Sequence, residues 1–202
     1  MEIFVIALGF LALWIANARA QARRIVFLSG FLRNYQIEKL METLADGYLR
    51  ALGEKDAERS RQVWAILETS EVQLCEQAIA LANELDKVPA PLARFSRLAL
   101  ALPPFALELF AWSAADLRPL MRIHAEGINQ VAANAQNLSQ RDRAFMLTAE
   151  MLLLQHTCHW FCRSRNIAHA RLLARHQTPY AQVLASVSSA TRDDYLARLA
   201  RR

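Results

Sequence analysis

Glycine and proline are scarce in this chain, with only 5 glycines and 6 prolines among 202 residues. β-branched residues are also few and scattered, so no stretch has the pattern of strands joined by tight turns. These shortages exclude turn-rich sandwiches and barrels. The residues that dominate instead are alanine, leucine, arginine, glutamate and glutamine, all of which favour helices. The sequence therefore predicts an all-α fold, a bundle of several helices.

Cysteine and lysine are the next shortages. The 3 cysteines are an odd number without the spacing of a disulfide framework, which favours a reducing compartment over an oxidising one. Lysine occurs only at Lys39, Lys55 and Lys87, so nearly all basic residues are arginine. This arginine bias, together with abundant alanine and leucine, is typical of a GC-rich bacterial genome.

Signatures of common enzyme classes are missing too. The five glycines are isolated, so no glycine-rich loop is available to bind phosphates. Neither a Cys-x-x-Cys nor a His-Glu-x-x-His motif occurs, and no glutamate is followed three residues later by histidine, as a di-iron bundle requires. No nucleophile elbow indicates hydrolysis. We therefore predict no catalytic residue and no cofactor, and we expect that the protein is not an enzyme.

A long uncharged stretch is present at the N-terminus. No charged residue occurs from Ile3 to Ala18, and a helix of this length spans about 24 Å, somewhat less than the ~30 Å of a bilayer core. Snorkelling of Arg19 and local thinning of the membrane close this gap. We predict a membrane anchor over residues 1–24, followed by a helical-bundle domain over residues 25–202. The lipid-facing side chains are expected to include Ile3, Phe4, Leu8, Phe10, Leu13 and Trp14.

The charges that flank this stretch predict its orientation. Glu2 precedes it, whereas Arg19, Arg23 and Arg24 follow it and are expected to lie at the lipid headgroups. Because arginine and lysine are retained on the cytoplasmic side, we expect the N-terminus outside and the helical domain in the cytoplasm. The expected location is a bacterial inner membrane.

Two alternatives remain for the N-terminal stretch. Its length also suits the apolar region of a secretory signal peptide, and Ala18-Arg19-Ala20 resembles a cleavage site, which would yield an exported soluble helical protein. The basic residues, however, follow the stretch instead of preceding it, as they would in such a signal. The other alternative is a helix that is buried in the protein or docked on a partner.

Helical periodicity continues beyond the anchor. Apolar residues recur at helical spacing as far as Leu52, so the anchor helix is expected to enter the domain and to be continuous with the first bundle helix. A second helix is expected over residues 56–87. The tandem Pro103-Pro104 predicts that residues 92–112 form two short helices or a sharp kink, because each proline removes a backbone donor.

The second half of the chain is predicted to hold four more helices. Ser113 and Asp116 resemble a capping box that begins a helix ending near residue 135. The most apolar helix is expected over residues 140–176. A short helix should follow Thr178-Pro179, and a last one should begin at Thr191.

One cluster of metal-binding residue types occurs, at His156, Cys158, His159 and Cys162. On a helix the two histidines share one face and the two cysteines another, so one tetrahedral metal ion cannot easily take all four ligands. Small buried cysteines and locally bonded histidines account for the pattern more simply. The alternative is a metal, redox or enzymatic site, which would need groups from another helix, such as His124 or Glu126.

The segment of residues 92–112 is rich in aromatic side chains. Phe95, Phe105, Phe110 and Trp112 lie on an element that two prolines should bend. Such an arrangement predicts a groove that binds a partner helix. The alternative is that these side chains close the core of the bundle.

Charge is distributed unevenly along the chain. Residues 38–87 carry eleven acidic and six basic residues, whereas residues 88–202 carry fourteen basic and seven acidic ones. This asymmetry is typical of a docking surface, and equally of ordinary solvated helix faces. No helix-turn-helix or other nucleic-acid signature accompanies the C-terminal arginines, so we expect contact with anionic lipid or an acidic partner and not with nucleic acid.

Together these features predict a membrane-anchored helical protein-interaction module. The expected role is an accessory or assembly subunit of a bacterial inner-membrane complex, for example in secretion or envelope machinery. Its expected partners are membrane lipid and the other subunits of that complex. The anchor would localise the domain, and the domain would offer binding surfaces in place of catalytic groups.

Overall fold

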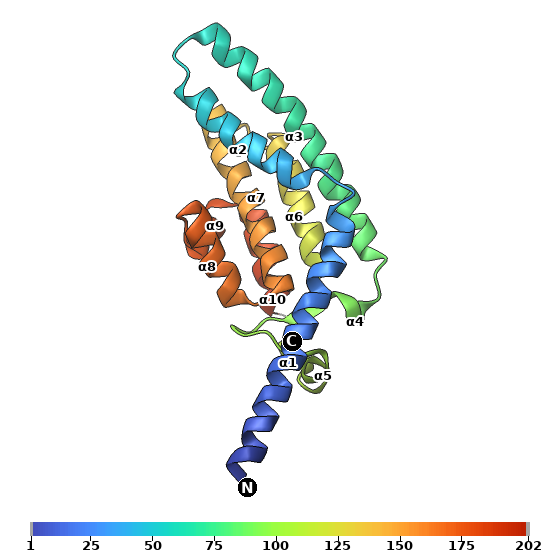
Figure 1. The fold of residues 1–202 in the computed structure, drawn as a ribbon. Helices are drawn as coiled ribbons and strands as arrows, with labels where there is room; N and C mark the ends of the chain where they lie inside the picture. Colours follow the sequence, from blue (N-terminus) through green and yellow to red (C-terminus); the bar gives the residue numbers. More distant parts are fainter. Residues whose placement is uncertain (1, 201–202) are drawn as a thin grey trace.

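A computed structural model describes residues 2–200 of the chain (Figure 1). These residues form ten α-helices, one short 3-10 helix and a two-stranded antiparallel sheet, so the predicted all-α bundle is confirmed. The helices are α1 (Glu2–Leu32), α2 (Ile37–Gly53), α3 (Ala57–Asp86), α4 (Ala90–Ala93), α5 (Pro104–Leu109), α6 (Leu117–Ala132), α7 (Gln140–Cys162), α8 (Arg165–His176), α9 (Tyr180–Ser186) and α10 (Ser189–Ala200). The 3-10 helix spans Ala111–Ser113, and the strands are β1 (Arg94–Ser96) and β2 (Ala114–Asp116).

The helices α2, α3, α6 and α7 form the body of the domain. Helices α2 and α3 pair as a hairpin, α3 packs against α6, and α6 packs against α7. Leucines fill the centre, and the fully buried ones include Leu44, Leu74, Leu81, Leu117, Leu120, Leu147 and Leu153. Asp56 begins α3 by accepting hydrogen bonds from the backbone N–H groups of Glu58 and Arg59, both at 2.9 Å. The helix predicted over residues 56–87 is thus confirmed.

Helix α1 enters the domain without a break but does not continue through Leu52. It ends at Leu32, and the next four residues form a turn in which the backbone N–H of Tyr35 donates to the carbonyl of Leu32 at 3.0 Å. The turn redirects the chain, so that Ile37 and Leu44 of α2 are buried in the core. The apolar stretch is therefore continuous with a helix of the domain, as predicted, but this helix ends at Leu32 and not near Leu52. In Figure 1 the turn between α2 and α3 lies at the end of the domain opposite to the N-terminus.

The helix predicted over residues 140–176 is divided into α7 and α8. The backbone of Arg163 leaves the helical conformation, and Ser164 then begins α8 by accepting a hydrogen bond from the backbone N–H of Ile167 at 3.3 Å. The break folds α8 back against α7. The prediction of a single long helix was wrong. Apolar residues occur at helical spacing on both sides of the break, so the sequence pattern does not reveal that Ser164 caps a new helix.

The connection between α3 and α6 is more complex than two short helices. Strands β1 and β2 pair in antiparallel register, with Phe95 opposite Ala115. Between them lies a stretch that contains α5 and the 3-10 helix, here called the basal segment (residues 97–113). The predicted capping box is not formed, because Ser113 is buried in the 3-10 helix. Asp116 alone caps α6, accepting a hydrogen bond from the backbone N–H of Arg118 at 3.0 Å.

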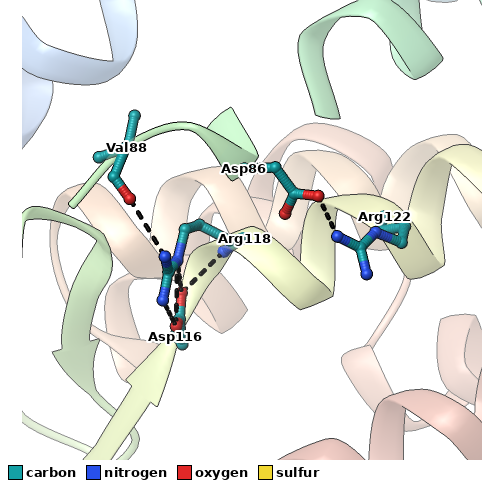
Figure 2. A network of polar contacts seen from close by, with 5 residues as sticks. All are labelled: Asp86, Val88, Asp116, Arg118 and Arg122. Carbon is teal, nitrogen blue, oxygen red and sulfur yellow. Dashed lines mark hydrogen bonds and ion pairs between the residues drawn. The ribbon is translucent and has the colours of Figure 1, made fainter. Parts of the chain in front are cut away.

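The side chain of Arg118 fastens both ends of this connection (Figure 2). Its guanidinium Nη2 donates to the carboxylate of Asp116 at 2.7 Å, and its Nη1 donates to the carbonyl of Val88 at 3.1 Å. Burial opposes ionisation of Asp116, but the hydrogen bonds and charge of Arg118 hold the pKa of its carboxyl below the usual value. Beside this pair, Arg122 binds Asp86 at the end of α3. These contacts fix the base of the β1–β2 ribbon.

Replacing Arg118 by alanine should destabilise the domain by about 1–3 kcal/mol, because two half-buried hydrogen-bond acceptors lose their charged donor. The measurement is urea unfolding of the full chain in mild detergent, followed by tryptophan fluorescence. Arg61→Ala is the control, since Arg61 and its partner Glu58 are both largely exposed, and it should change the free energy of unfolding by less than about 0.5 kcal/mol. Equal effects of the two substitutions would contradict a stabilising role for the contacts of Arg118 with Asp116 and Val88.

Candidate functional site

The N-terminal half of α1 projects from the domain, and its side chains are not covered by the rest of the chain. The exposed fractions of the predicted lipid-facing residues are 84% for Ile3, 68% for Phe4, 49% for Leu8, 70% for Phe10, 46% for Leu13 and 69% for Trp14. Large apolar side chains on all sides of a helix are stable only in an apolar medium or against a partner. Helix α1 is long and apolar enough to cross a membrane.

The arginines that follow this stretch do not share one environment. Arg19 and Arg23 are exposed, as a contact with lipid headgroups requires. Arg24 is different, because it is only 8% exposed and its Nη2 donates to the carbonyl of Leu102 in the basal segment at 3.4 Å. The prediction that Arg24 faces the lipid is therefore wrong. It joins α1 to the basal segment instead.

The four aromatic residues predicted to form a partner groove are separated in the structure. Phe95 is fully buried, and its ring packs edge-on against Trp160 at a centroid distance of 5.3 Å. The pairing of β1 with β2 turns this side chain into the core. Phe105, Phe110 and Trp112 are exposed on the basal segment. The predicted groove with Phe95 as a lining residue is thus not formed, but the other three members are exposed on one short segment, where the ring centroids of Phe110 and Trp112 lie 6.5 Å apart.

The structure also divides the histidine and cysteine cluster. His156 and Cys158 lie about 200° apart around α7, so they point in opposite directions. His156 faces α8 and α9, where its ring stacks on His169 at a centroid distance of 5.0 Å and lies tilted against Tyr180 at 4.6 Å. Burial lowers the pKa of His156 to about 3, so it is neutral at physiological pH.

The other three members line a cavity of about 150 Å³ between α1, α2 and α7. Burial raises the pKa of Cys162 to about 11 and raises that of Cys158 further, so both thiols stay protonated. Protonated thiols are poor nucleophiles and poor metal ligands. Burial lowers the pKa of His159 to about 4. Among residues 2–200, no three His, Cys, Asp or Glu side chains converge as metal ligands, and neither His124 nor Glu126 completes such a group.

Two sets of buried polar contacts involve α7, and no motif in the sequence predicts them. The Nε2 atom of His124 is 2.8 Å from the hydroxyl of Thr157, and that hydroxyl is 3.4 Å from the hydroxyl of Tyr195. Glu150 accepts a hydrogen bond from the backbone N–H of Ser188 at 3.0 Å. These side chains are at most 1% exposed. The contacts of Thr157 join α7 to α6 and α10. Because all these side chains lack access to solvent, they do not offer a reactive group to a substrate.

Comparison with known proteins gives no match, since no family model, curated protein or solved structure is significantly similar to this chain. The candidate site therefore depends on the geometry alone. It consists of the exposed apolar half of α1, the two exposed arginines that follow it, and the apolar surface of the basal segment.

The buried histidines predict a loss of stability in acid. His124 and His156 both have a pKa of about 3 in the folded chain because of burial, whereas an unfolded histidine binds its proton near pH 6.5. As the pH falls from about 6.5 towards 3, only the unfolded state takes up these protons, so each histidine lowers the free energy of unfolding by roughly 1 kcal/mol per pH unit. His156→Phe, which keeps a stacking ring, should weaken the pH dependence by that amount in urea titrations between pH 6.5 and 4.

His176 supplies the control for this measurement, since it is exposed at the end of α8. His176→Phe should leave most of the acid sensitivity in place. If His156→Phe and the unaltered chain lost stability in parallel, His156 would not be the buried neutral base that the structure shows.

Proposed function

We propose that this protein is a membrane-anchored protein-interaction module, an accessory or assembly subunit of a bacterial inner-membrane complex. The observation that carries the proposal is the exposed apolar half of α1, which is joined by continuous helix to a packed domain. A bilayer would cover side chains that the rest of the chain leaves uncovered. The second half of α1 would hold the domain directly at the membrane surface.

The proposed orientation has the N-terminus outside and the domain in the cytoplasm. Arg19 and Arg23 are exposed just after the apolar stretch, and Glu2 is the acidic residue that precedes it. This asymmetry supports retention of the arginine side in the cytoplasm. The arginine-rich composition of the chain supports a bacterial membrane.

Interaction is favoured over catalysis because the reactive residue types do not converge. The thiols are protonated, the most polar cluster is closed to solvent, and the remaining prominent features are surfaces. One such surface, distant from the apolar half of α1, is the hairpin of α2 and α3. It belongs to the acidic stretch of the chain and also exposes Leu49, Ile66 and Val72, at 74%, 66% and 57%. Acidic and apolar groups on one hairpin suit a partner protein with a basic, partly apolar face.

The test is affinity purification of the full chain from native membranes in mild detergent. We expect a partner at near-stoichiometric amount. The double substitution Glu68→Lys and Glu76→Lys reverses two exposed charges on α3 and should release that partner, because like charges then face each other. The control Arg171→Glu with Arg175→Glu reverses two exposed charges on α8 and should retain it. A chain that purifies alone would contradict the proposal, and so would a partner that both double variants retain equally.

A further inference from the structure

The basal segment leaves an unusual amount of apolar surface uncovered. Leu100, Phe105, Leu109, Phe110 and Trp112 are between 45% and 75% exposed. Isolated exposed apolar residues are ordinary, but five on one short segment mark a contact surface. The position of the segment beside α1 indicates what covers this surface.

The basal segment lies beside α1 at the level where the apolar stretch ends. Pro103, Pro104 and Phe105 share a surface pocket with Ala16 and Arg19 of α1. Figure 1 shows α5 alongside α1 where that helix leaves the domain. At about 1.5 Å per residue, Phe105 is only one or two helical turns above Trp14. A bilayer crossed by residues 3–18 would therefore have its headgroup region at the height of Phe105.

The segment is also held firmly in this place. The hydroxyl of Ser113 donates to the carbonyl of Phe110 at 2.7 Å, and the hydroxyl of Ser96 donates to the carbonyl of Leu100 at 2.8 Å. Arg24 of α1 donates to the carbonyl of Leu102, and Arg118 binds Asp116 and the carbonyl of Val88 at the base of the β1–β2 ribbon. Because these contacts fix the backbone, the apolar side chains are not free to fold back into the core.

Charge around the segment suits an anionic surface. Arg19, Arg23 and Arg94 are exposed on this side of the domain. Glu108 is the acidic residue among them, and it shares a pocket with Arg23 and Arg94. Arginines beside exposed aromatic rings are the combination that binds the interface of an anionic bilayer.

We propose that the basal segment inserts its apolar side chains into the interface of the bilayer that α1 crosses. This inference rests on the anchoring proposed above. The aromatic rings of Phe105, Phe110 and Trp112 would lie at the depth of the headgroups, next to Arg19 and Arg23. With two points of contact the domain would not swing freely about α1. The hairpin of α2 and α3 would then point away from the membrane, towards a partner.

The test is quenching of tryptophan fluorescence by lipids brominated near the headgroup end of the acyl chain. The full chain is reconstituted in vesicles of phosphatidylethanolamine and phosphatidylglycerol. Trp64 and Trp160 are buried in the domain, at 5% and 2% exposed, so they supply the background. Trp14→Phe leaves Trp112 as the reporter of the basal segment, and Trp112→Phe leaves Trp14 as the reporter of α1. The double variant measures the background alone.

We expect both single variants to lose a larger fraction of their fluorescence than the double variant does. If only Trp112→Phe is quenched above the background, α1 is inserted but the basal segment is not, and the inference is overturned while the anchoring stands. If neither single variant exceeds the background, the anchoring itself fails. Quenching by aqueous iodide is a second measurement on the same variants. If neither brominated lipid nor iodide quenches Trp112, another copy of the chain covers it, and the inference is overturned.

Discussion

Helix α1 must satisfy two environments along one continuous backbone. From Ala20 onwards its side chains pack into the domain, where Leu28 is buried and Arg24 binds the basal segment. Before Ala20 the same helix carries large apolar side chains that the rest of the chain does not cover. Because α1 is an unbroken, rigid helix, the surroundings of its N-terminal half also determine where the base of the domain lies. The proposed bilayer contact, the arginines at its edge and the distant acidic hairpin all depend on this continuity.

Much of the architecture could be predicted from the sequence, because composition and apolar periodicity are strong signals for helices. The helix capped by Asp56 and the apolar N-terminal stretch are examples. The breaks after Leu32 and at Arg163 were not predictable in this way, since helical spacing of apolar residues resumes after a few polar residues at each and the chain turns to satisfy tertiary packing. The β1–β2 ribbon was missed for a similar reason, because strands of three residues are too short to show alternation.

The candidate site shows the same division between local and long-range information. Exposure of Ile3 and Trp14 followed from a run of apolar residues too long and too uniform for one face of a bundle. The burial of Arg24 and Phe95 did not, because each is decided by a partner far away in the sequence. The buried contacts of His124 and Glu150 gave no sequence signal, since their partners lie far away in the sequence and share no motif with them.

Membrane integration of α1 is tested most directly by alkaline carbonate extraction of membranes from cells that make the full chain. Integration predicts that the unaltered chain stays with the membrane pellet. Leu8→Arg places a charge within the apolar stretch at a cost of about 2.5–3.5 kcal/mol and should shift the chain towards the soluble fraction. Val26→Arg, at an exposed position beyond the stretch, should not. An unaltered chain found in the carbonate supernatant would contradict the proposed anchoring and favour export or docking of α1 on a partner.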